Sequence, residues 1–419
     1  RRVGPGGGAL SGWRADPATG ELSPLRALVL LFALLATAPQ PSSLHGRWRG
    51  ALDLAGATLP FELRFQRTAG ALAAELCNGP HCDTRAAVQL RGDSVVLHIA
   101  DYDAMIATIR RGDSLIGVYQ NVGRNGPRSI PFRAARGSWP ERAGPPALLG
   151  TWDAWWITEQ RRSPRVLVFQ NGAQGLEGGV VSNTGDLGSF WGAMVGDSFA
   201  VARFDGVSVY VLAGRLDGDT LRGVFHAGLR TQTPYVAVRS SGVPHLVAPT
   251  ALTTADTVNP FRFAFPDLAG QLVTQDDPRF KGKVVLIDIF GSWCVTCHEA
   301  TPHLLELYRD YRAKGLEILG LGYEVTGDST KDNPQIRRFR DKFGIPWPLL
   351  FAGASIVEET AASLPQLQGF TAYPTTIFLG RDGRIRQVYA GFRGASAGAQ
   401  HQKQIQDYRN IIERLLAER

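Results

Sequence analysis

The chain has 419 residues, enough for two to four domains of ordinary size. Apolar residues make up 44% and charged residues 20%, a balance typical of globular proteins and not of fibrous or disordered ones. The net charge of +7 is a small excess, and no run of five or more basic residues occurs, so we expect no nucleic-acid partner. Only four cysteines are present, too few for a scaffold held together by disulfides.

An apolar stretch, Ala27 to Ala38, follows Arg26 near the N-terminus. Its twelve residues are too few to span a bilayer, which takes about 20. A basic residue, a short apolar run and small residues at its end are typical of a secretory signal peptide. We therefore expect residues 1–43 to be a disordered leader with a signal peptide, and the protein to be exported to the periplasm. A retained N-terminal membrane anchor and a buried helix or strand are the alternatives.

Residues 44–240 contain an internal repeat with an offset of about 104 positions. The triplet at 46–48, Gly-Arg-Trp, recurs at 150–152 as Gly-Thr-Trp, and the Gly-Asp turns at 92–93 and 112–113 recur at 196–197 and 218–219. Short runs with alternating apolar residues lie between such turns, which indicates antiparallel strands. We predict a duplicated all-β half, with units at 44–140 and 147–240, each a barrel or a sandwich.

Cys77 and Cys82 flank the sequence Asn-Gly-Pro-His, which is typical of a tight turn. In an exported protein we expect a structural disulfide here, and a free pair or a second redox centre are the alternatives. The β half shows no catalytic constellation and no metal-ligand spacing among its histidines, so no metal is expected. Its tryptophans are interpreted as core residues, with a ligand-binding surface as the alternative.

Residues 241–258 contain two prolines and many small residues, which favours a linker. From residue 259 to 419 apolar strand-like runs alternate with helical patterns. Strands are expected at 283–290, 316–321, 346–350, 374–379 and 384–389, and helices at 298–314, 333–343 and 402–416. This alternation predicts an α/β sheet domain with a terminal hairpin.

The second cysteine pair, Cys294 and Cys297, lies where the strand at 283–290 passes into a helix. Unpaired N–H groups and the dipole at a helix N-terminus stabilise a thiolate and lower the pKa of the first cysteine. Cys294 is therefore expected to attack or be attacked, and Cys297 to resolve the mixed disulfide. Zinc sites also use Cys-x-x-Cys, but the sequence offers no suitable second ligand pair.

With these residues the C-terminal region resembles the TlpA/ResA-type exported thiol–disulfide oxidoreductases of the thioredoxin-like superfamily. The resemblance covers about residues 259–418. It rests on Trp293 directly before Cys294, on Pro302, on the Tyr-Pro-Thr motif at 373–375 and on the insertion at 328–351. It implies a thioredoxin fold with a cis-proline at Pro374. It also implies substrate contacts at Tyr373, Pro374, Val295 and Thr296, with Trp293 part of the catalytic motif.

Two acids are candidates for proton transfer. Asp288, six residues before Cys294, matches the buried acid of cytosolic thioredoxins and is expected to exchange a proton with Cys297. The alternative is a strand residue that points into a polar cap. Some relatives carry a glutamate three residues after the second cysteine, where this chain has Ala300 beside Glu299, and Glu324 is a candidate to supply that acid instead.

We therefore predict a periplasmic thiol–disulfide oxidoreductase that acts on protein disulfides, as a reductase, with the Cys294–Cys297 disulfide and no other cofactor. The resemblance implies a membrane electron donor of the DsbD or CcdA type. A thiol peroxidase shares the fold, but that family needs Thr or Ser where this chain has Gly291. A third interpretation makes the β half a ligand- or partner-binding module with an accessory redox domain.

Overall fold

The computed structural model describes residues 44–68, 70–123, 126–243 and 245–418. The leader and signal peptide predicted at 1–43 lie outside the described residues. Within the described part of the chain, none of the helices combines the length and the apolar character needed to cross a membrane.

The first β unit is a closed antiparallel barrel in which each strand pairs with the next and the last pairs with the first. A closed barrel has no edge strand, so all its strands find partners within the unit. Its strands are β1 (Gly46–Leu54), β2 (Ala57–Thr68), β3 (Ala71–Asn78), β4 (His81–Arg91), β5 (Ser94–Ile99), β6 (Ala104–Arg111), β7 (Ser114–Gly123) and β8 (Gly126–Arg136). A short 3₁₀ turn, η1 (Ala100–Tyr102), connects β5 to β6.

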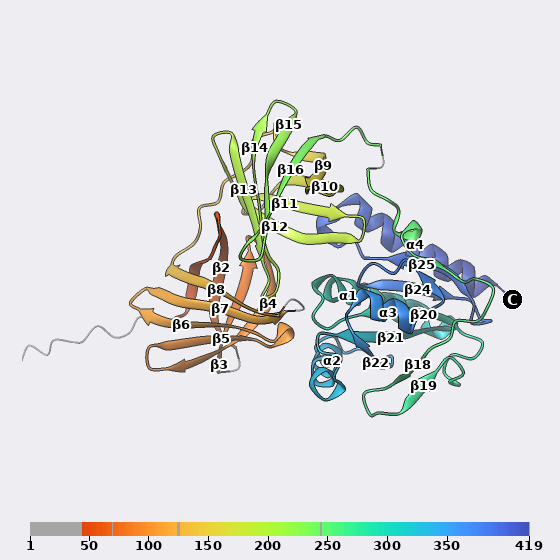
Figure 1. Ribbon diagram of the computed structural model, residues 1–419. Coiled ribbons are helices and arrows are strands. Elements are labelled where there is room, and N and C mark those ends of the chain that lie inside the picture. The colour runs from red at the N-terminus through yellow and green to blue at the C-terminus, as the bar shows by residue number, and fades with distance from the viewer. Residues whose placement is uncertain (1–43, 69, 124–125, 244, 419) are drawn as a thin grey trace, which may run out of the picture. The chain divides into compact units, whose positions relative to one another are not determined.

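The second unit is another closed barrel with the same strand order, shown in yellow-green to green in Figure 1. Its strands are β9 (Gly150–Ile157), β10 (Arg162–Gly172), β11 (Gly175–Ser182), β12 (Gly185–Val195), β13 (Ser198–Phe204), β14 (Val209–Asp217), β15 (Thr220–Ala227) and β16 (Thr231–Arg239). The predicted duplicated all-β half is therefore confirmed, and each unit is a barrel and not a sandwich.

The two barrels share a repeated anchoring contact that reflects the duplication. The indole N–H of Trp48 donates to the carbonyl of Leu44, and that of Trp152 donates to the carbonyl of Leu148, both at 2.9 Å. Each indole is covered by an arginine from its barrel's last strand, Arg136 at 4.8 Å and an equivalent arginine at 4.1 Å. Both tryptophans are fully buried, so they belong to the barrel cores and not to a binding surface.

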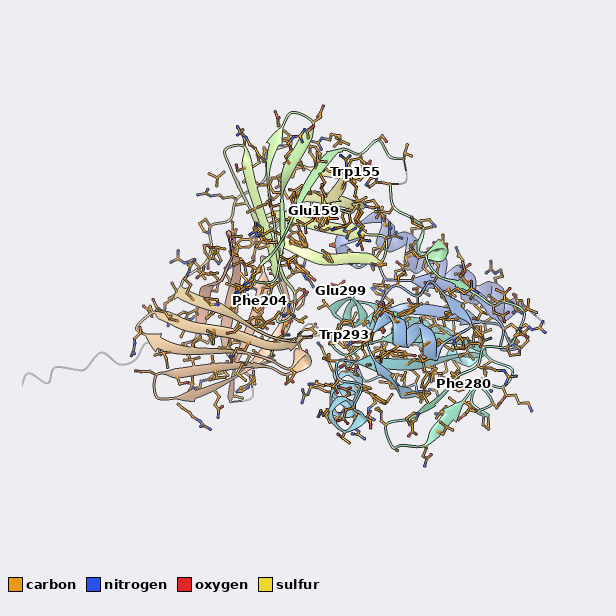
Figure 2. The ribbon with its side chains drawn as sticks, in the orientation of Figure 1. Trp155, Glu159, Phe204, Phe280, Trp293 and Glu299 are labelled. Atoms are coloured by element: carbon orange, nitrogen blue, oxygen red, sulfur yellow. A yellow bond between two sulfur atoms is a disulfide. The ribbon has the colours of Figure 1, made fainter. Side chains whose placement is uncertain are left out.

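The barrels are joined by residues 204–206 of the second one, between β13 and β14. Phe204, labelled in Figure 2, belongs to the core of the first barrel. Its ring packs against that of Phe61, with centroids 4.6 Å apart. The side chain of Asn78 bonds to both the N–H and the carbonyl of Phe204, and Tyr119 donates to the carbonyl of Gly206 at 2.8 Å. These contacts connect the two barrels through an apolar core and buried hydrogen bonds.

The C-terminal domain is an α/β domain built on a five-stranded sheet with the order β22-β21-β20-β24-β25. The central strand β20 pairs in parallel with β21 and antiparallel with β24, and every residue of β20 is buried. Helices flank the sheet (Figure 1). The elements are β20 (Val284–Phe290), α1 (Val295–Tyr311), β21 (Leu316–Glu324), α2 (Ser329–Phe343), β22 (Leu349–Ala354), α3 (Val357–Ser363), β24 (Thr375–Leu379), β25 (Ile385–Ala390) and α4 (Ala399–Ala417). The predicted α/β domain with a terminal hairpin is confirmed.

Several boundaries differ from those expected from the sequence. Helix α2 begins at Ser329 and not at 333, because the side chain of Asp328 accepts the N–H of Thr330 and caps the helix there. The expected linker, 241–258, contains the 3₁₀ turn η2 (Pro249–Ala251) and the short strand β17 (Thr254–Ala255). Strand β17 pairs with β23 (Leu367–Gln368), so this end of the linker is part of the C-terminal domain. Such short pairings leave little trace in sequence periodicity.

Candidate functional site

Cys294 is the N-cap residue of α1, directly after the buried strand β20. Its backbone is extended, and its sulfur accepts a hydrogen bond from the N–H of Cys297 at 3.3 Å. Both cysteines are free thiols in the structure, and Cys294 is 6% exposed whereas Cys297 is 1% exposed. A sulfur at this position faces the backbone N–H groups that have no partner within the helix. The more exposed sulfur is therefore the one placed for attack.

The Tyr373–Pro374 peptide bond is cis and lies beside the first cysteine. The Cys294 sulfur donates to the carbonyl of Tyr373 at 3.7 Å. The ring of Tyr373 packs edge-on against Trp293 with centroids 5.5 Å apart, and the Trp293 indole N–H donates to the carbonyl of Tyr323 at 2.9 Å. Figure 2 shows Trp293 near the start of α1. The proline motif and the Trp-Cys-x-x-Cys motif, far apart in sequence, thus form one surface.

Asp288 lies in the middle of β20 and is buried, with no hydrogen-bond partner for its Oδ1 among the described residues. Burial raises the pKa of Asp288 to about 7. Burial also raises the pKa of the Cys297 thiol, and the neighbouring Cys294 and the Asp288 carboxyl add to this rise. Asp288 thus lies in the buried central strand, close enough to Cys297 for its carboxyl to affect the pKa of that thiol.

Glu324 ends β21 and is 2% exposed. Its two oxygens lie 2.7 Å from the N–H and from the hydroxyl of Ser292, two residues before Cys294. Burial raises the pKa of Glu324 to about 8, and the two bonds from Ser292 oppose this rise. Glu324 thus holds the loop that precedes the first cysteine.

The first barrel reaches the start of α1 through its η1 turn. Lys342 of α2 pairs with Asp101 at 2.6 Å and lies 3.2 Å from Nδ1 of His298, the residue after Cys297. The Nε2 atom of His298 lies 2.7 Å from the carbonyl of Ser292, which can only accept, so Nε2 carries the proton and Nδ1 accepts from Lys342. Burial and Lys342 lower the pKa of His298 to about 4, so it is neutral. Its ring packs against Tyr102 with centroids 5.1 Å apart.

The second barrel reaches the same helix through a buried arginine. Arg203 of β13 is 1% exposed, and it pairs with Asp205 at 2.9 Å and with Glu299 of α1 at 3.3 Å. Asp186 of β12 accepts the N–H of Gly394 at 2.8 Å and also bonds to the hydroxyl of Ser396. These contacts fix the second barrel against the active-site helix and the segment that follows β25.

A cleft of about 830 Å³ lies at Cys294, and residues of both barrels and of the C-terminal domain line it. Of the residues expected to contact substrate, Val295, Thr296 and Tyr373 line this cleft, together with Trp293 and Glu324. Pro374 is buried and is not among the lining residues. The first barrel supplies Tyr102, Asn121 and Arg128, and the second supplies Asp186, Ser208 and Tyr210. Sequence reasoning did not foresee this contribution.

Cys77 and Cys82 form a disulfide across the hairpin between β3 and β4. They also form, with Glu75, a group with ligand atoms close enough for a metal, but the two sulfurs are already bonded to each other. This hairpin contacts the second barrel, since Thr84 donates to the carbonyl of Asp205 at 2.6 Å. The disulfide therefore lies in the connection between the barrels.

Gly291 stands where a thiol peroxidase would need a hydroxyl residue. A Cβ atom added at Gly291 would lie 2.2 Å from Nε1 of Trp293 and 2.8 Å from the carbonyl oxygen of Tyr323. Such distances exclude a side chain unless the tryptophan moves. The loop before Cys294 is thus built for glycine, which argues against the peroxidase alternative.

Comparisons with known proteins agree on the C-terminal region. Residues 253–402 match the Redoxin family. Thiol-disulfide oxidoreductase ResA from Bacillus thuringiensis subsp. konkukian is 27% identical over 129 residues, and its counterpart from Geobacillus thermodenitrificans is 28% identical over the same length. Each match covers 31% of this chain and 66% of the relative, so it spans just under two thirds of the relative's length.

Solved structures that resemble the chain cover about two fifths of it. A thiol:disulfide interchange protein of the thioredoxin family from Chlorobium tepidum covers 40% of this chain and 99% of its own, with 18% identity and a TM-score of 0.29. A secreted thiol-disulfide isomerase from Corynebacterium glutamicum covers 43% and 96%, with 19% identity and a TM-score of 0.31. The motif at Cys294, the fold around it and the match to the Redoxin family together make the C-terminal part of the chain similar to the ResA thiol-disulfide oxidoreductases.

Proposed function

We propose that the protein is a thiol–disulfide oxidoreductase that acts on protein thiols and disulfides through Cys294 and Cys297, with no cofactor besides the disulfide these two form. The observation that carries the proposal is the position of Cys294. Its sulfur accepts the N–H of Cys297 at the start of α1 and lies 3.7 Å from the carbonyl of Tyr373, in a cleft. A substrate sulfur that enters this cleft meets both the Cys294 sulfur and the backbone carbonyl of Tyr373.

The proposed reaction moves two electrons from the dithiol to a substrate disulfide. The Cys294 thiolate attacks one substrate sulfur, a mixed disulfide forms, and the other substrate sulfur leaves as a thiolate that takes up a proton. Cys297 then loses its proton and attacks the Cys294 sulfur. The mixed disulfide breaks, the Cys294–Cys297 disulfide forms, and the second substrate sulfur leaves as a thiol.

The surroundings of the two cysteines support different roles for them. Cys294 accepts a backbone N–H at the start of α1 and is the more exposed of the two sulfurs, which suits it for attack. Burial raises the pKa of Cys297, so it keeps its proton until a base takes it. Asp288 is the group proposed to do so, because its own pKa of about 7 lets it accept and return a proton near neutral pH.

The proposal also covers the cellular compartment and the direction of electron transfer. The Cys77–Cys82 disulfide supports an oxidising location, because such bonds persist outside the cytosol. The apolar stretch 27–38 supports export to the periplasm, as a cleaved or a retained N-terminal segment. In the reductase direction the chain needs an electron source, and a membrane donor of the DsbD or CcdA type is proposed from the resemblance to TlpA/ResA-type proteins.

The test of the activity is reduction of a disulfide-linked protein, such as insulin, by the full chain with a thiol regenerant. Cys294→Ser is expected to reduce the catalysed rate to that of the regenerant alone. The matched control is Cys77→Ser with Cys82→Ser, which removes the other pair and is expected to retain the activity. Undiminished activity of the Cys294→Ser chain would refute the proposal.

The direction is tested separately by the reduction potential of the Cys294/Cys297 couple. A potential near that of thioredoxin, about −270 mV, would support a reductase. A potential near that of the strong oxidant DsbA, about −120 mV, would reverse the direction.

A further inference from the structure

The cleft at Cys294 has walls from three folded units. Its volume of about 830 Å³ matches pockets that enclose a small molecule or a few residues of an extended chain. The η1 turn of the first barrel is fixed at one side by Lys342 and by Arg338, which donates to the carbonyl of Ala100 at 2.6 Å. Arg203 and Asp186 fix the second barrel at the other side. A substrate must therefore present its disulfide on a segment that enters the cleft.

The charged residues that line the cleft are mostly acidic. The basic ones are Arg128, which donates to Asn121 at 3.1 Å, and Lys331, which pairs with Asp328 at 3.3 Å. The acidic ones are Asp101, Asp103, Asp186, Glu299, Glu324 and Asp332. Four of these already bond to protein groups, as described above. Asp103 is exposed to solvent, whereas Asp332 is buried and is not among the acids whose bonds are described above.

Asp332 is a buried carboxyl in which one of the two oxygens lacks a protein partner within the described part of the chain. It is 4% exposed, and its Oδ2 has no hydrogen-bond partner among the described residues. It lies in the first turn of α2. Its charge acts on Glu324, which bonds to Ser292 two residues before Cys294, so Asp332 belongs to the same end of the cleft as the reactive sulfur. A buried carboxyl oxygen without a hydrogen-bond partner is costly, and a cationic ligand group would supply the donor that Oδ2 lacks among the residues described.

We propose that the cleft binds an extended, positively charged, disulfide-bearing segment and that Asp332 is the specificity-determining residue that recognises a lysine or arginine next to the substrate cysteine. The inference rests on the proposed function, since it names the substrate class of the same site. Asp332 makes its contact with the substrate side chain, whereas Cys294 alone reacts with the substrate sulfur.

The experiment measures binding, so that it does not depend on turnover. Three short disulfide-linked peptides are made that differ only in the residue beside the cysteine, which is Lys, Gln or Glu. Their dissociation constants are measured with the full chain carrying Cys294→Ser, which lacks the attacking sulfur. The Lys peptide is expected to bind about tenfold more tightly than the Gln peptide, and the Glu peptide more weakly than both, as a charge-assisted hydrogen bond implies. Adding Asp332→Asn is expected to bring the Lys-to-Gln ratio to about one.

Asp341→Asn is the matched control, because Asp341 lies on the same helix, is 67% exposed and pairs with Arg340. It is expected to leave the Lys-to-Gln ratio unchanged. A second measurement needs no change at Asp332: raising the salt concentration is expected to weaken the preference of the Cys294→Ser chain for the Lys peptide. Two results would overturn the inference. One is a Lys-to-Gln binding ratio near one in the chain that keeps Asp332. The other is a ratio that stays high after Asp332→Asn. Failure of the wild-type chain to reduce any of the three peptides would instead refute the proposed function, and the binding ratios would still decide the role of Asp332.

Discussion

Glu299 of the active-site helix and Arg203 of the second barrel form an ion pair in which Oε1 and Nη2 are 3.3 Å apart. Glu299 lies two residues after Cys297, and Figure 2 shows it close to the start of α1. Burial raises the pKa of Glu299 to about 8, and the Arg203 guanidinium opposes that rise. The position of the redox helix is thus coupled to a buried charge that belongs to a different folded unit.

Removing this arginine is expected to destabilise the chain strongly. Arg203→Met leaves the buried Asp205 and the partly exposed Glu299 without their cation, and an uncompensated buried charge such as that of Asp205 typically costs about 3–5 kcal/mol in unfolding free energy. The control Arg215→Met removes an arginine that is 70% exposed and pairs with Asp197, and a loss within about 1 kcal/mol is expected. Urea unfolding of both variants measures the difference. Equal, small losses would show that the Arg203 cluster contributes little to stability.

Asp288 is expected to control the step in which Cys297 releases the substrate. Because the pKa of Asp288 is about 7, the carboxyl is protonated below that pH and cannot accept a proton. The rate of mixed-disulfide resolution should therefore rise with pH through about 7. Asp288→Asn should remove this inflection and slow resolution by about 100-fold or more at pH 7. Stopped-flow measurement of single turnovers across pH 5.5–8.5 checks this, and an unchanged pH profile in the variant would exclude Asp288 as the base.

The barrels could be predicted as β units because their alternation and their Gly-Asp turns are local features. The closure of the first barrel could not be predicted in this way. It depends on the pairing of β1 with β8, and no local sequence pattern specifies that pairing. The reactive cysteines likewise lie in one short motif. The contacts that enclose them are remote: Arg203 and Glu299 are 96 residues apart, and Asp101 and Lys342 are 241 apart. A single sequence carries no signal for such pairs, which explains why the contribution of the barrels to the cleft was missed.

The burial of two acids also predicts how stability depends on pH. Asp288 has a pKa of about 7 in place of 3.8, and Glu324 about 8 in place of 4.5. Between the ordinary pKa and the raised pKa of each acid, the folded chain binds more protons than the unfolded chain. The stability of the folded chain should therefore fall as pH rises from about 4 to about 8. Asn and Gln imitate the neutral acids, and the double variant Asp288→Asn/Glu324→Gln should lose less stability over this range, by about 2 kcal/mol or more. Denaturant unfolding at pH 5, 7 and 9 in one redox state tests this, with Asp341→Asn as the control.

Removing the Cys77–Cys82 disulfide is expected to weaken the connection between the barrels without affecting the redox centre. The bond closes a loop with a sequence separation of only 5, so the chain-entropy gain is small, about 2 kcal/mol. The same hairpin carries Asn78 and Thr84, whose side chains bond to residues 204–205 of the second barrel. Cys77→Ser with Cys82→Ser should therefore lower the unfolding free energy by about 2 kcal/mol and increase amide hydrogen exchange in 204–206 more than in β20. If exchange rose equally in both segments, the disulfide would stabilise the whole chain and not this contact in particular.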